Sequence, residues 1–389
     1  MADEHGMFVT GGGPLPHMDW SNQLQDLVSL RQGCHTVLGG NAPSTPAQDF
    51  AAMAQWCQDN QVSYDHYGEG EVVQGFERKI AALLGYEAGL FVMSGTLAQA
   101  TALRLASTAR ARPLVGLHGT AHVLKHERSN YQLLDHFKAI LLGDAHRPWL
   151  ASDLAAVPDE LGAVLYELPM REIGGQMPTW DELDAIKAAC RARQIHLHLD
   201  GARLWEAAVG YGRRLDEVTA GFDSTYVSLY KGVGGLAGAV LVGSKAFIDQ
   251  ARVWVARQGG NLYRRTPYVV SAAMQFDARL ARLPACLQRT QWLYAVLADY
   301  PLLAPNPRRP QVNMLHLHMP VSAQQANEIR NRIAQTHRIW LFGGASSCQE
   351  QGRSYIEWYV GDNLLAMTDQ QVRDALTAWH DALRDATAA

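Results

Sequence analysis

Three side chains able to bind a charged ligand follow two apolar stretches near the middle of the chain. The stretch QIHLHLD (194–200) closes on Asp200, and Arg203 follows three residues later. The stretch DSTYVSLY (223–230) leads directly to Lys231, which opens a glycine-rich loop. A helix-capping ion pair and a solvated lysine would explain these residues without a ligand. Alternatively, the carboxylate and guanidinium bind a charged ligand, and the lysine forms a Schiff base after partial burial lowers its pKa.

An anion site and a flat ring are predicted at two other strand ends. Ser94, Gly95 and Thr96 separate the expected strand 88–93 from a helix, so free backbone N–H groups and the helix dipole can bind a phosphate. A well-capped helix without a ligand is the alternative. His122 follows the next strand and either lies at the surface or stacks on an aromatic ligand.

One cofactor requires this whole set of groups at the carboxyl ends of strands, where open α/β sheets bind ligands. That cofactor is pyridoxal 5′-phosphate (PLP): Lys231 would take its aldehyde, and the helix N-terminus its phosphate. Asp200 would keep the ring nitrogen protonated, which makes the ring an electron sink. Arg203 would then hold the carboxylate of an amino-acid substrate by two parallel hydrogen bonds.

A metal site is the competing interpretation of the strand that ends at Asp200. His196, His198 and Asp200 alternate along it, so their side chains share one face and could coordinate zinc in a hydrolase. The metal signature HxHxDH needs a histidine at the next position, where this chain has Gly201. Packing of the two histidines in the core is therefore the favoured interpretation, and no metal is expected.

The composition indicates a large globular protein. Of 389 residues, 48% are hydrophobic and 19% are charged. The net charge is −4 and the basic residues are scattered, which gives no sign of a nucleic-acid or membrane partner. Five widely spaced cysteines without a CxxC motif favour a reducing compartment. The N-terminus lacks a basic region followed by an apolar stretch, so we expect a cytoplasmic protein.

Apolar strands alternate with amphipathic helices from about residue 70, which predicts an α/β fold with a mainly parallel sheet of about seven strands. The expected strands cover residues 88–93, 113–117, 138–143, 161–168, 194–200, 223–230 and 237–243. Capping residues predict helix starts at Thr96, with Gln99 three residues on, and at Thr179. We divide the chain into an N-terminal arm (1–50), a large PLP-binding domain (51–295) and a small α+β C-terminal domain (296–389).

The sequence resembles the low-specificity threonine aldolases of the β-eliminating lyase group, which are fold type I PLP enzymes. The likeness covers about residues 30 to 380 and is carried mainly by HLDGARLWEAA (198–208), whose aspartate precedes a Lys-Gly pair by 31 residues. FVMSGTLAQ (91–99) is similar to that family's phosphate-binding segment. TAHVLKHE (120–127) is similar to the segment whose histidine, here His122, stacks on the cofactor ring.

The resemblance implies further site residues and an assembly. Arg353 would be a second ligand of the substrate carboxylate, and His35 would lie near the substrate. Tyr67 belongs to YDHYGEGEVVQGFERKIAALLG (64–85), which is similar to a segment of the family at the subunit interface. Because the resemblance implies a homodimer or homotetramer with shared active sites, Tyr67 would reach the cofactor of a neighbouring subunit.

Several expected pocket positions depart from the family's pattern. A serine and an acid near the N-terminus of the family become Cys34 and His35, and the small hydroxyl residue before the lysine becomes Tyr230. Tyr263 stands where the family has an arginine in the phosphate region, although two arginines follow it. The family's Glu-Asn-Thr-His segment becomes ELPMREIGG (167–175). These changes bear on the identity of the substrate more than on PLP.

The resemblance predicts a lyase that cleaves the Cα–Cβ bond of a β-hydroxy-α-amino acid, giving glycine and an aldehyde. His122, His126, His35 or water could accept the proton of the β-hydroxyl group. Another PLP reaction on an amino acid, β-elimination or transamination, is the first alternative. A metal-dependent hydrolase that uses His196, His198 and Asp200 is the second.

Overall fold

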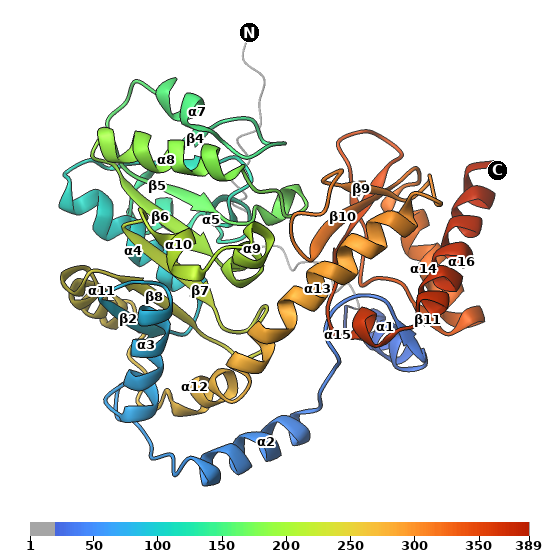
Figure 1. The fold of residues 1–389 in the computed structure, drawn as a ribbon, viewed down its shortest axis with the longest axis horizontal. Coiled ribbons are helices and arrows are strands. Elements are labelled where there is room, and N and C mark those ends of the chain that lie inside the picture. Colours follow the sequence, from blue (N-terminus) through green and yellow to red (C-terminus); the bar gives the residue numbers. More distant parts are fainter. Residues whose placement is uncertain (1–19, 389) are drawn as a thin grey trace, which may run out of the picture.

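A seven-stranded sheet lies at the centre of the larger half of the molecule, and a four-stranded sheet lies in the smaller half (Figure 1). This computed structural model describes residues 20–388, so residues 1–19 of the expected arm lie outside the described part. A long helix, α13 (Phe276–Leu297), runs from the larger half to the smaller one. The domain boundary expected near residue 295 therefore falls inside a helix rather than in a linker.

The large sheet is mainly parallel. Its strands, in order across the sheet, are β2 (Ala88–Val92), β8 (Ala239–Gly243), β7 (Ser224–Ser228), β6 (His196–Gly201), β5 (Leu161–Glu167), β3 (Leu114–His118) and β4 (Lys138–Leu142). Of these seven, β8 is antiparallel to both of its neighbours. The loop 229–238 joins β7 to β8 without a helix, and a parallel neighbour would need a longer crossover. The expected fold class, a mainly parallel α/β sheet of about seven strands, is confirmed.

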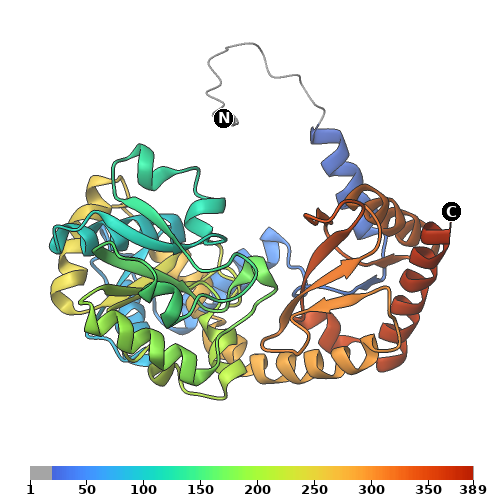
Figure 2. The ribbon, with the colours of Figure 1, turned by 90° about the horizontal axis from the view of Figure 1, so that it is seen from above.

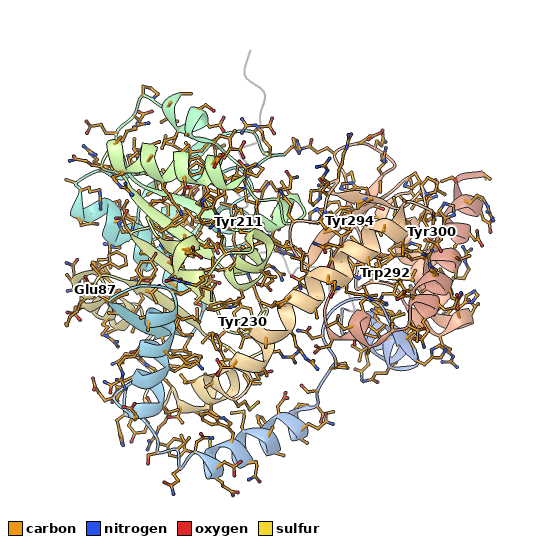
Figure 3. The ribbon with its side chains drawn as sticks, viewed as in Figure 1. Glu87, Tyr211, Tyr230, Trp292, Tyr294 and Tyr300 are labelled. Atoms are coloured by element: carbon orange, nitrogen blue, oxygen red, sulfur yellow. The ribbon has the colours of Figure 1, made fainter. Side chains whose placement is uncertain are left out.

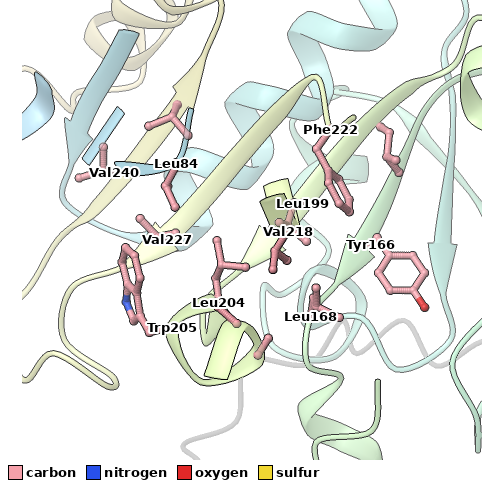
Figure 4. Packing of buried hydrophobic residues seen from close by; sticks show 14 of the residues in the cluster. Leu84, Tyr166, Leu168, Leu199, Leu204, Trp205, Val218, Phe222, Val227 and Val240 are labelled. Atoms are coloured by element: carbon pink, nitrogen blue, oxygen red, sulfur yellow. The ribbon is translucent and has the colours of Figure 1, made fainter. Parts of the chain in front are cut away.

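Helices cover both faces of the large sheet. One face packs against α3 (Glu71–Leu83), α7 (Ala151–Ala155), α8 (Trp180–Ala192), α9 (Leu204–Tyr211), α10 (Leu215–Thr219), α12 (Thr266–Ala273) and α13. Figure 4 shows this core, in which Leu199, Trp205 and Val227 are buried. The other face packs against α4 (Gly95–Ala109), α5 (His122–Lys125), α6 (Asn130–Leu133) and α11 (Lys245–Arg257). Within residues 20–388, no helix is long and apolar enough to cross a membrane.

The small domain is an antiparallel sheet with helices on the side away from the large sheet (Figure 2). Its strands, in order, are β12 (Ser346–Ser347), β13 (Ser354–Tyr359), β10 (Met314–Met319) and β9 (Ala304–Asn306). Its other helices are α14 (Ala323–His337), α15 (Asp362–Ala366) and α16 (Asp369–Ala388). Alternate residues of β13 face opposite ways, so Ile356 and Trp358 enter the small-domain core while Glu357 and Tyr359 face the large domain.

Part of the N-terminal arm is packed against the small domain. The described part of the arm contains α1 (Trp20–Gln32), β1 (Thr36–Val37) and the beginning of α2 (Pro46–Asp59), a helix without buried residues. β1 pairs in parallel with β11 (Ile339–Trp340), and Leu38 is fully buried in the small-domain core. The expectation of an unpacked arm is therefore wrong for residues 36–38, because their partner strand lies near the other end of the chain.

Candidate active site

Asp200 lies at the carboxyl end of β6, in the middle of the large sheet. Its carboxylate is 2% exposed and accepts hydrogen bonds from Gln99 Nε2 at 2.5 Å and from the Ala202 backbone N–H at 3.0 Å. Burial raises the pKa of Asp200, and the nearby Lys231 amine opposes that rise. A buried carboxylate with two donors and a cationic neighbour can hold a positive N–H group of a ligand.

Lys231 follows β7, the next strand of the sheet, and is half-buried. Burial lowers the pKa of its amine, whereas Asp200 and Glu167 act in the opposite direction. A lowered pKa increases the fraction of neutral, nucleophilic amine at physiological pH. The preceding residue, Tyr230, is 41% exposed and lies in the large-sheet half of the molecule (Figure 3). At Gly238, where φ is +106°, a Cβ would clash with the Phe91 ring, so the loop can close only with glycine there.

The predicted anion site lies at the N-terminus of α4. Ser94 is the N-cap, and its side chain accepts a hydrogen bond from the Leu97 backbone N–H at 3.2 Å. The expected helix start at Thr96 is therefore wrong by two residues, because the Ser94 hydroxyl reaches N3 first. The N–H groups of Gly95 and Thr96 have no acceptor within the helix and remain available to an anion.

His122 begins the short helix α5, and Glu127 fixes its ring. His122 Nδ1 lies 3.0 Å from Oε1 of Glu127, a carboxylate that is 4% exposed. The rings of His122 and His126 lie 5.0 Å apart, and His126 Nε2 lies 2.8 Å from Oε1 of Glu172. The site therefore holds a fixed imidazole and, beside it, a second imidazole that pairs with a different carboxylate.

Arg203 is the N-cap of α9 and meets the small domain. Its Nη2 atom lies 3.3 Å from Oε1 of Glu357 on β13, and its guanidinium lies 5.4 Å from the Tyr359 ring centroid. Its Nε atom is buried and has no hydrogen-bond partner. Glu357 also contacts Arg171, whose Nε atom lies 2.6 Å from Oε2 of the same carboxylate. Two arginines thus converge on one carboxylate where the two domains meet.

Three residues predicted for the site contact other partners. Arg353 directly precedes β13 and pairs with Glu350 at 3.5 Å. His35 is exposed and contacts the Thr36 hydroxyl at 2.8 Å. Tyr67 is 54% exposed and packs edge-on against Tyr263, with ring centroids 5.3 Å apart. The roles that we assign to Arg353, His35 and Tyr67 stay predictions.

Sequence reasoning missed two buried carboxyl groups of this site. Glu167 ends β5 beside Asp200, and burial together with the Asp200 charge raises the pKa of Glu167 to about 8. Glu206 on α9 is 2% exposed and lies near the lysine loop, since a Cβ at Gly232 would clash with its carboxylate. The acidic residue at the end of a buried strand was a usable signal for Glu167. The sequence around Glu206 gives no indication of its burial, because a glutamate is an ordinary residue within a helix.

The two strand histidines have partners other than a metal. His196 Nε2 and His198 Nδ1 each lie 2.7 Å from the Ser224 hydroxyl oxygen on β7, and His198 Nε2 lies 2.8 Å from Gln99 Oε1 on α4. His196 and His198 therefore lie on the same face of β6, as their alternation along the strand predicts. Within residues 20–388, no group of three or more metal-ligating side chains is present. The interpretation of His196 and His198 as passive core residues is also incomplete, because they form a hydrogen-bonded chain.

The chemistry of these groups fits PLP. The α4 N-terminus offers N–H donors for a phosphate, and a buried carboxylate suits a protonated ring nitrogen. An amine with a lowered pKa suits an aldehyde, and the unpartnered Nε atom of Arg203 suits a carboxylate. The close backbone approach at Gly95, where a Cβ would clash with the Tyr226 hydroxyl, leaves no room for a side chain beside the anion site.

Comparison with known proteins decides the family. The sequence profile of the beta-eliminating lyases matches residues 45–320, which is most of the chain. The chain belongs to the beta-eliminating lyase family. Enzymes of this family depend on PLP, so this lyase uses the cofactor that the site fits.

Several proteins similar to this beta-eliminating lyase are threonine aldolases. The chain is 32% identical over 207 residues to the low specificity L-threonine aldolase of Saccharomyces cerevisiae, covering 50% of this chain and 52% of that protein. It is 27% identical over 260 residues to the low specificity L-threonine aldolase of Escherichia coli K12, covering 66% and 78%. About half of the yeast protein's length is thus matched.

Two solved structures share the fold over almost the whole chain. A candidate L-allo-threonine aldolase from Listeria monocytogenes EGD-E superposes with a TM-score of 0.86 at 32% identity, covering 92% of this chain and 99% of that one. A candidate aromatic amino acid beta-eliminating lyase/threonine aldolase from Exiguobacterium sp. 255-15 superposes with a TM-score of 0.85 at 32% identity and equal coverage. Serine palmitoyltransferase from Sphingomonas wittichii shares the fold alone, with a TM-score of 0.65 at 14% identity.

Proposed function

We propose that this chain is a PLP-dependent aldehyde-lyase that cleaves the Cα–Cβ bond of a β-hydroxy-α-amino acid, giving glycine and an aldehyde. The observation that carries the proposal is the meeting of Lys231, Asp200 and Arg203 at one edge of the sheet. The pKa values of Asp200 and Lys231 each respond to the charge of the other, and Arg203 acts on Lys231. The threonine aldolases among the relatives support the same reaction.

Each residue has a part in this reaction. Lys231 would hold the cofactor through its amine, Asp200 would hold its ring nitrogen, and the α4 N-terminus would hold its phosphate. When bound, PLP supplies a conjugated ring that accepts the electrons of the broken bond. Arg203 would bind the substrate carboxylate and so orient the Cα–Cβ bond, because the bond that lies perpendicular to the ring is the one that breaks. His122 would cover one face of the ring.

We assign the proton acceptor for the β-hydroxyl group to His126. Glu127 holds Nδ1 of His122, and a ring stacked on the cofactor is badly placed to reach the β-hydroxyl oxygen. His126 lies beside it, and a hydrogen bond to Glu172 fixes one of its nitrogens while the other stays free to accept a proton. His35 is exposed and contacts Thr36, so its geometry supports this role less well.

A visible absorption spectrum of the purified enzyme tests the proposal. We expect an absorption band from the bound cofactor that changes on adding glycine or L-threonine, and that is lost in Lys231→Ala. Lys245→Ala is the matched control, because Lys245 is an exposed lysine paired with Asp249. An unchanged spectrum with every amino acid tried would refute the proposal.

Analysis of the products separates the competing reactions. Cα–Cβ cleavage of L-threonine gives glycine and acetaldehyde, whereas β-elimination of serine gives pyruvate and ammonia. Transamination would instead yield a keto acid and leave the amine on the cofactor. Formation of pyruvate without glycine would assign the chain to β-elimination. No observation favours a metal-dependent hydrolase, since His196 and His198 bond to Ser224 and Gln99.

We further propose a homodimer or homotetramer in the cytoplasm. The exposed rings of Tyr64, Tyr67 and Tyr263 support a subunit interface beside the site, because large apolar side chains are seldom left in water together. All five cysteines carry free thiols, which supports a reducing compartment. Light scattering coupled to size-exclusion chromatography tests the assembly, and a monomer that retains full activity would refute shared active sites.

A further inference from the structure

A chain of four consecutive hydrogen bonds links side chains of the large sheet and of α4, and it ends at Asp200. It begins at His196 Nε2, which lies 2.7 Å from the Ser224 hydroxyl oxygen, and continues from that oxygen to His198 Nδ1 at 2.7 Å. His198 Nε2 then lies 2.8 Å from Gln99 Oε1, and Gln99 Nε2 lies 2.5 Å from Asp200 Oδ2. The five side chains come from β6, β7 and α4 and are all at most 5% exposed.

The direction of each hydrogen bond in this chain follows from its last link. Gln99 presents its Nε2 atom to Asp200 and its Oε1 atom to His198, which is the orientation that an ionised Asp200 requires, because a carboxylate only accepts. His198 must therefore carry its proton on Nε2, which leaves Nδ1 to accept the hydroxyl proton of Ser224. The Ser224 oxygen then accepts the Nε2–H of His196. Every donor in the chain thus points toward Asp200.

Burial keeps both imidazoles in the neutral form that this direction requires. It lowers the pKa of His198 to about 3, and the pKa of His196 is likewise lowered to about 3. A neutral imidazole has one donor and one acceptor nitrogen. His198 can therefore accept a hydrogen bond from Ser224 on one nitrogen and donate one to Gln99 from the other. A protonated ring would have two donors, and His198 could then no longer accept the Ser224 hydroxyl.

We propose that this chain, which we term the Asp200 relay, acts as a positioning device that fixes the Gln99 amide and thereby holds Asp200 as a carboxylate beneath the cofactor nitrogen. His196, Ser224, His198 and Gln99 are its positioning residues. The proposal rests on the function proposed above, since it takes Asp200 as the partner of the ring nitrogen. It also gives the two strand histidines a role that is neither metal binding nor simple packing.

The surroundings of Asp200 explain why such a device is needed. Within the large domain, the titratable groups that act on it or lie beside it are Glu167, Lys231, His122, Glu127, Tyr226 and Tyr230. Burial and the Glu127 charge raise the pKa of Asp200 and so favour the protonated acid, which could not keep a ring nitrogen protonated. Besides the Ala202 N–H, the Gln99 NH₂ group is the donor bonded to this carboxylate among the described residues. Reversal of that amide would place two oxygens 2.5 Å apart and remove a charge-assisted hydrogen bond.

Nuclear magnetic resonance of the holoenzyme loaded with PLP labelled with ¹⁵N in the ring tests the relay directly. The ¹⁵N shift reports whether the ring nitrogen carries a proton, which a loss of general stability would not change. Ser224→Ala removes the hydroxyl group that bonds to His196 and His198, which lies three hydrogen bonds away from Asp200. His198 can then change tautomer. Gln99→Met removes the side-chain NH₂ group that donates to Asp200, with little change in side-chain volume. Thr225→Val is the matched control, because this buried residue of β7 bonds to the Tyr86 hydroxyl on the other face of the sheet.

We expect the protonated shift in the wild type and in Thr225→Val, and a displacement toward the unprotonated shift in Ser224→Ala and, more strongly, in Gln99→Met. PLP should bind at least about tenfold more weakly to Gln99→Met, as expected for the loss of one hydrogen bond to a charged group. Wild-type shifts in both relay variants, or an equal displacement in Thr225→Val, would overturn the proposal. An unprotonated nitrogen in the wild type would overturn it together with the role of Asp200. A protonated nitrogen without cleavage of any β-hydroxy amino acid would refute the proposed reaction alone.

Discussion

The Arg203 guanidinium is paired with Glu357, a carboxylate from the other domain of the same chain. Arg203 Nη2 lies 3.3 Å from Glu357 Oε1, while the second oxygen of that carboxylate is held by Arg171 at 2.6 Å. Arg203 is the proposed ligand of the substrate carboxylate, so Glu357 occupies one of the donors that the substrate would use. The stronger contact with Arg171 can persist while Arg203 turns to the substrate.

Replacement of this internal carboxylate should improve substrate binding. In Glu357→Gln the neutral amide keeps its shape and its contact with Arg171 but competes less for Arg203. We expect KM for the amino acid to fall about fivefold, which corresponds to the ~1 kcal/mol of a partly exposed ion pair, with little change in kcat. Steady-state kinetics measures both constants. Asp369→Asn, which breaks an ion pair between α13 and α16, should leave KM unchanged. A higher KM in Glu357→Gln would show that Glu357 orients Arg203 rather than competing with the substrate.

Loss of the proposed proton acceptor should slow the chemical step. His126→Gln removes the basic nitrogen, while its side-chain NH₂ group can take the place of Nε2 beside Glu172, and we expect kcat to fall by about 10²-fold or more. Lys125→Met, at the neighbouring exposed position, is the control for a local disturbance of α5. Retention of the wild-type kcat in His126→Gln would assign the proton acceptor to another group.

A single methyl group at the anion site should weaken cofactor binding. In Gly95→Ala the new Cβ would clash with the Tyr226 side chain, so the α4 N-terminus must shift. We expect a loss of about 1–3 kcal/mol in the free energy of unfolding and weaker binding of PLP. Thermal unfolding and a PLP titration measure the two effects. In Gly119→Ala the Cβ would meet only Ala145 at 3.7 Å, so this control should behave like the wild type.

The buried carboxyl of Glu167 should make stability depend on pH. Its pKa in the folded protein is raised to about 8, whereas an unfolded glutamate titrates at about 4.3. Between these values the folded state keeps a proton that the unfolded state releases, so raising the pH favours unfolding. The contribution approaches about 1.4 kcal/mol per pH unit and has its full destabilising value above about pH 8.

Denaturant unfolding of the holoenzyme across this pH range should reveal the effect of Glu167. Glu167→Gln cannot release a proton, and its amide oxygen can still accept the Arg171 backbone N–H. We expect its free energy of unfolding to fall less steeply with pH than that of the wild type. Glu160→Gln, at an exposed glutamate paired with Arg112, should follow the wild type. Parallel curves for Glu167→Gln and the wild type would contradict the raised pKa.

Local patterns in the sequence were sufficient for the order of the elements and for the groups at the strand ends. Buried strands such as LGAVLYE read as continuous apolar runs because helices cover both of their faces, and this pattern is visible without a structure. Asp200 and Lys231 directly follow such runs. Since parallel strands bring their carboxyl ends to one edge, their proximity was predictable before any contact was known.

Patterns limited to neighbouring residues failed where the partner lies far away in the chain. The spacing from Thr96 predicts that Gln99 caps α4, yet its side chain reaches Asp200 and His198 on the sheet. The composition of residues 1–50 predicts that Leu38 belongs to an arm, yet it lies in the small-domain core. Each error has the same cause, because a polar or apolar side chain is satisfied by whichever element packs against it.

Periodicity and residue type were thus enough to predict the fold class, the cofactor chemistry and the face on which His196, His198 and Asp200 lie. The partners of these residues became known from the folded chain: Ser224 and Gln99 in place of a metal, and Glu357 opposite Arg203. The physical reason is that hydrogen bonds and ion pairs depend on distances of about 3 Å between groups that chain folding, and not chain order, brings together.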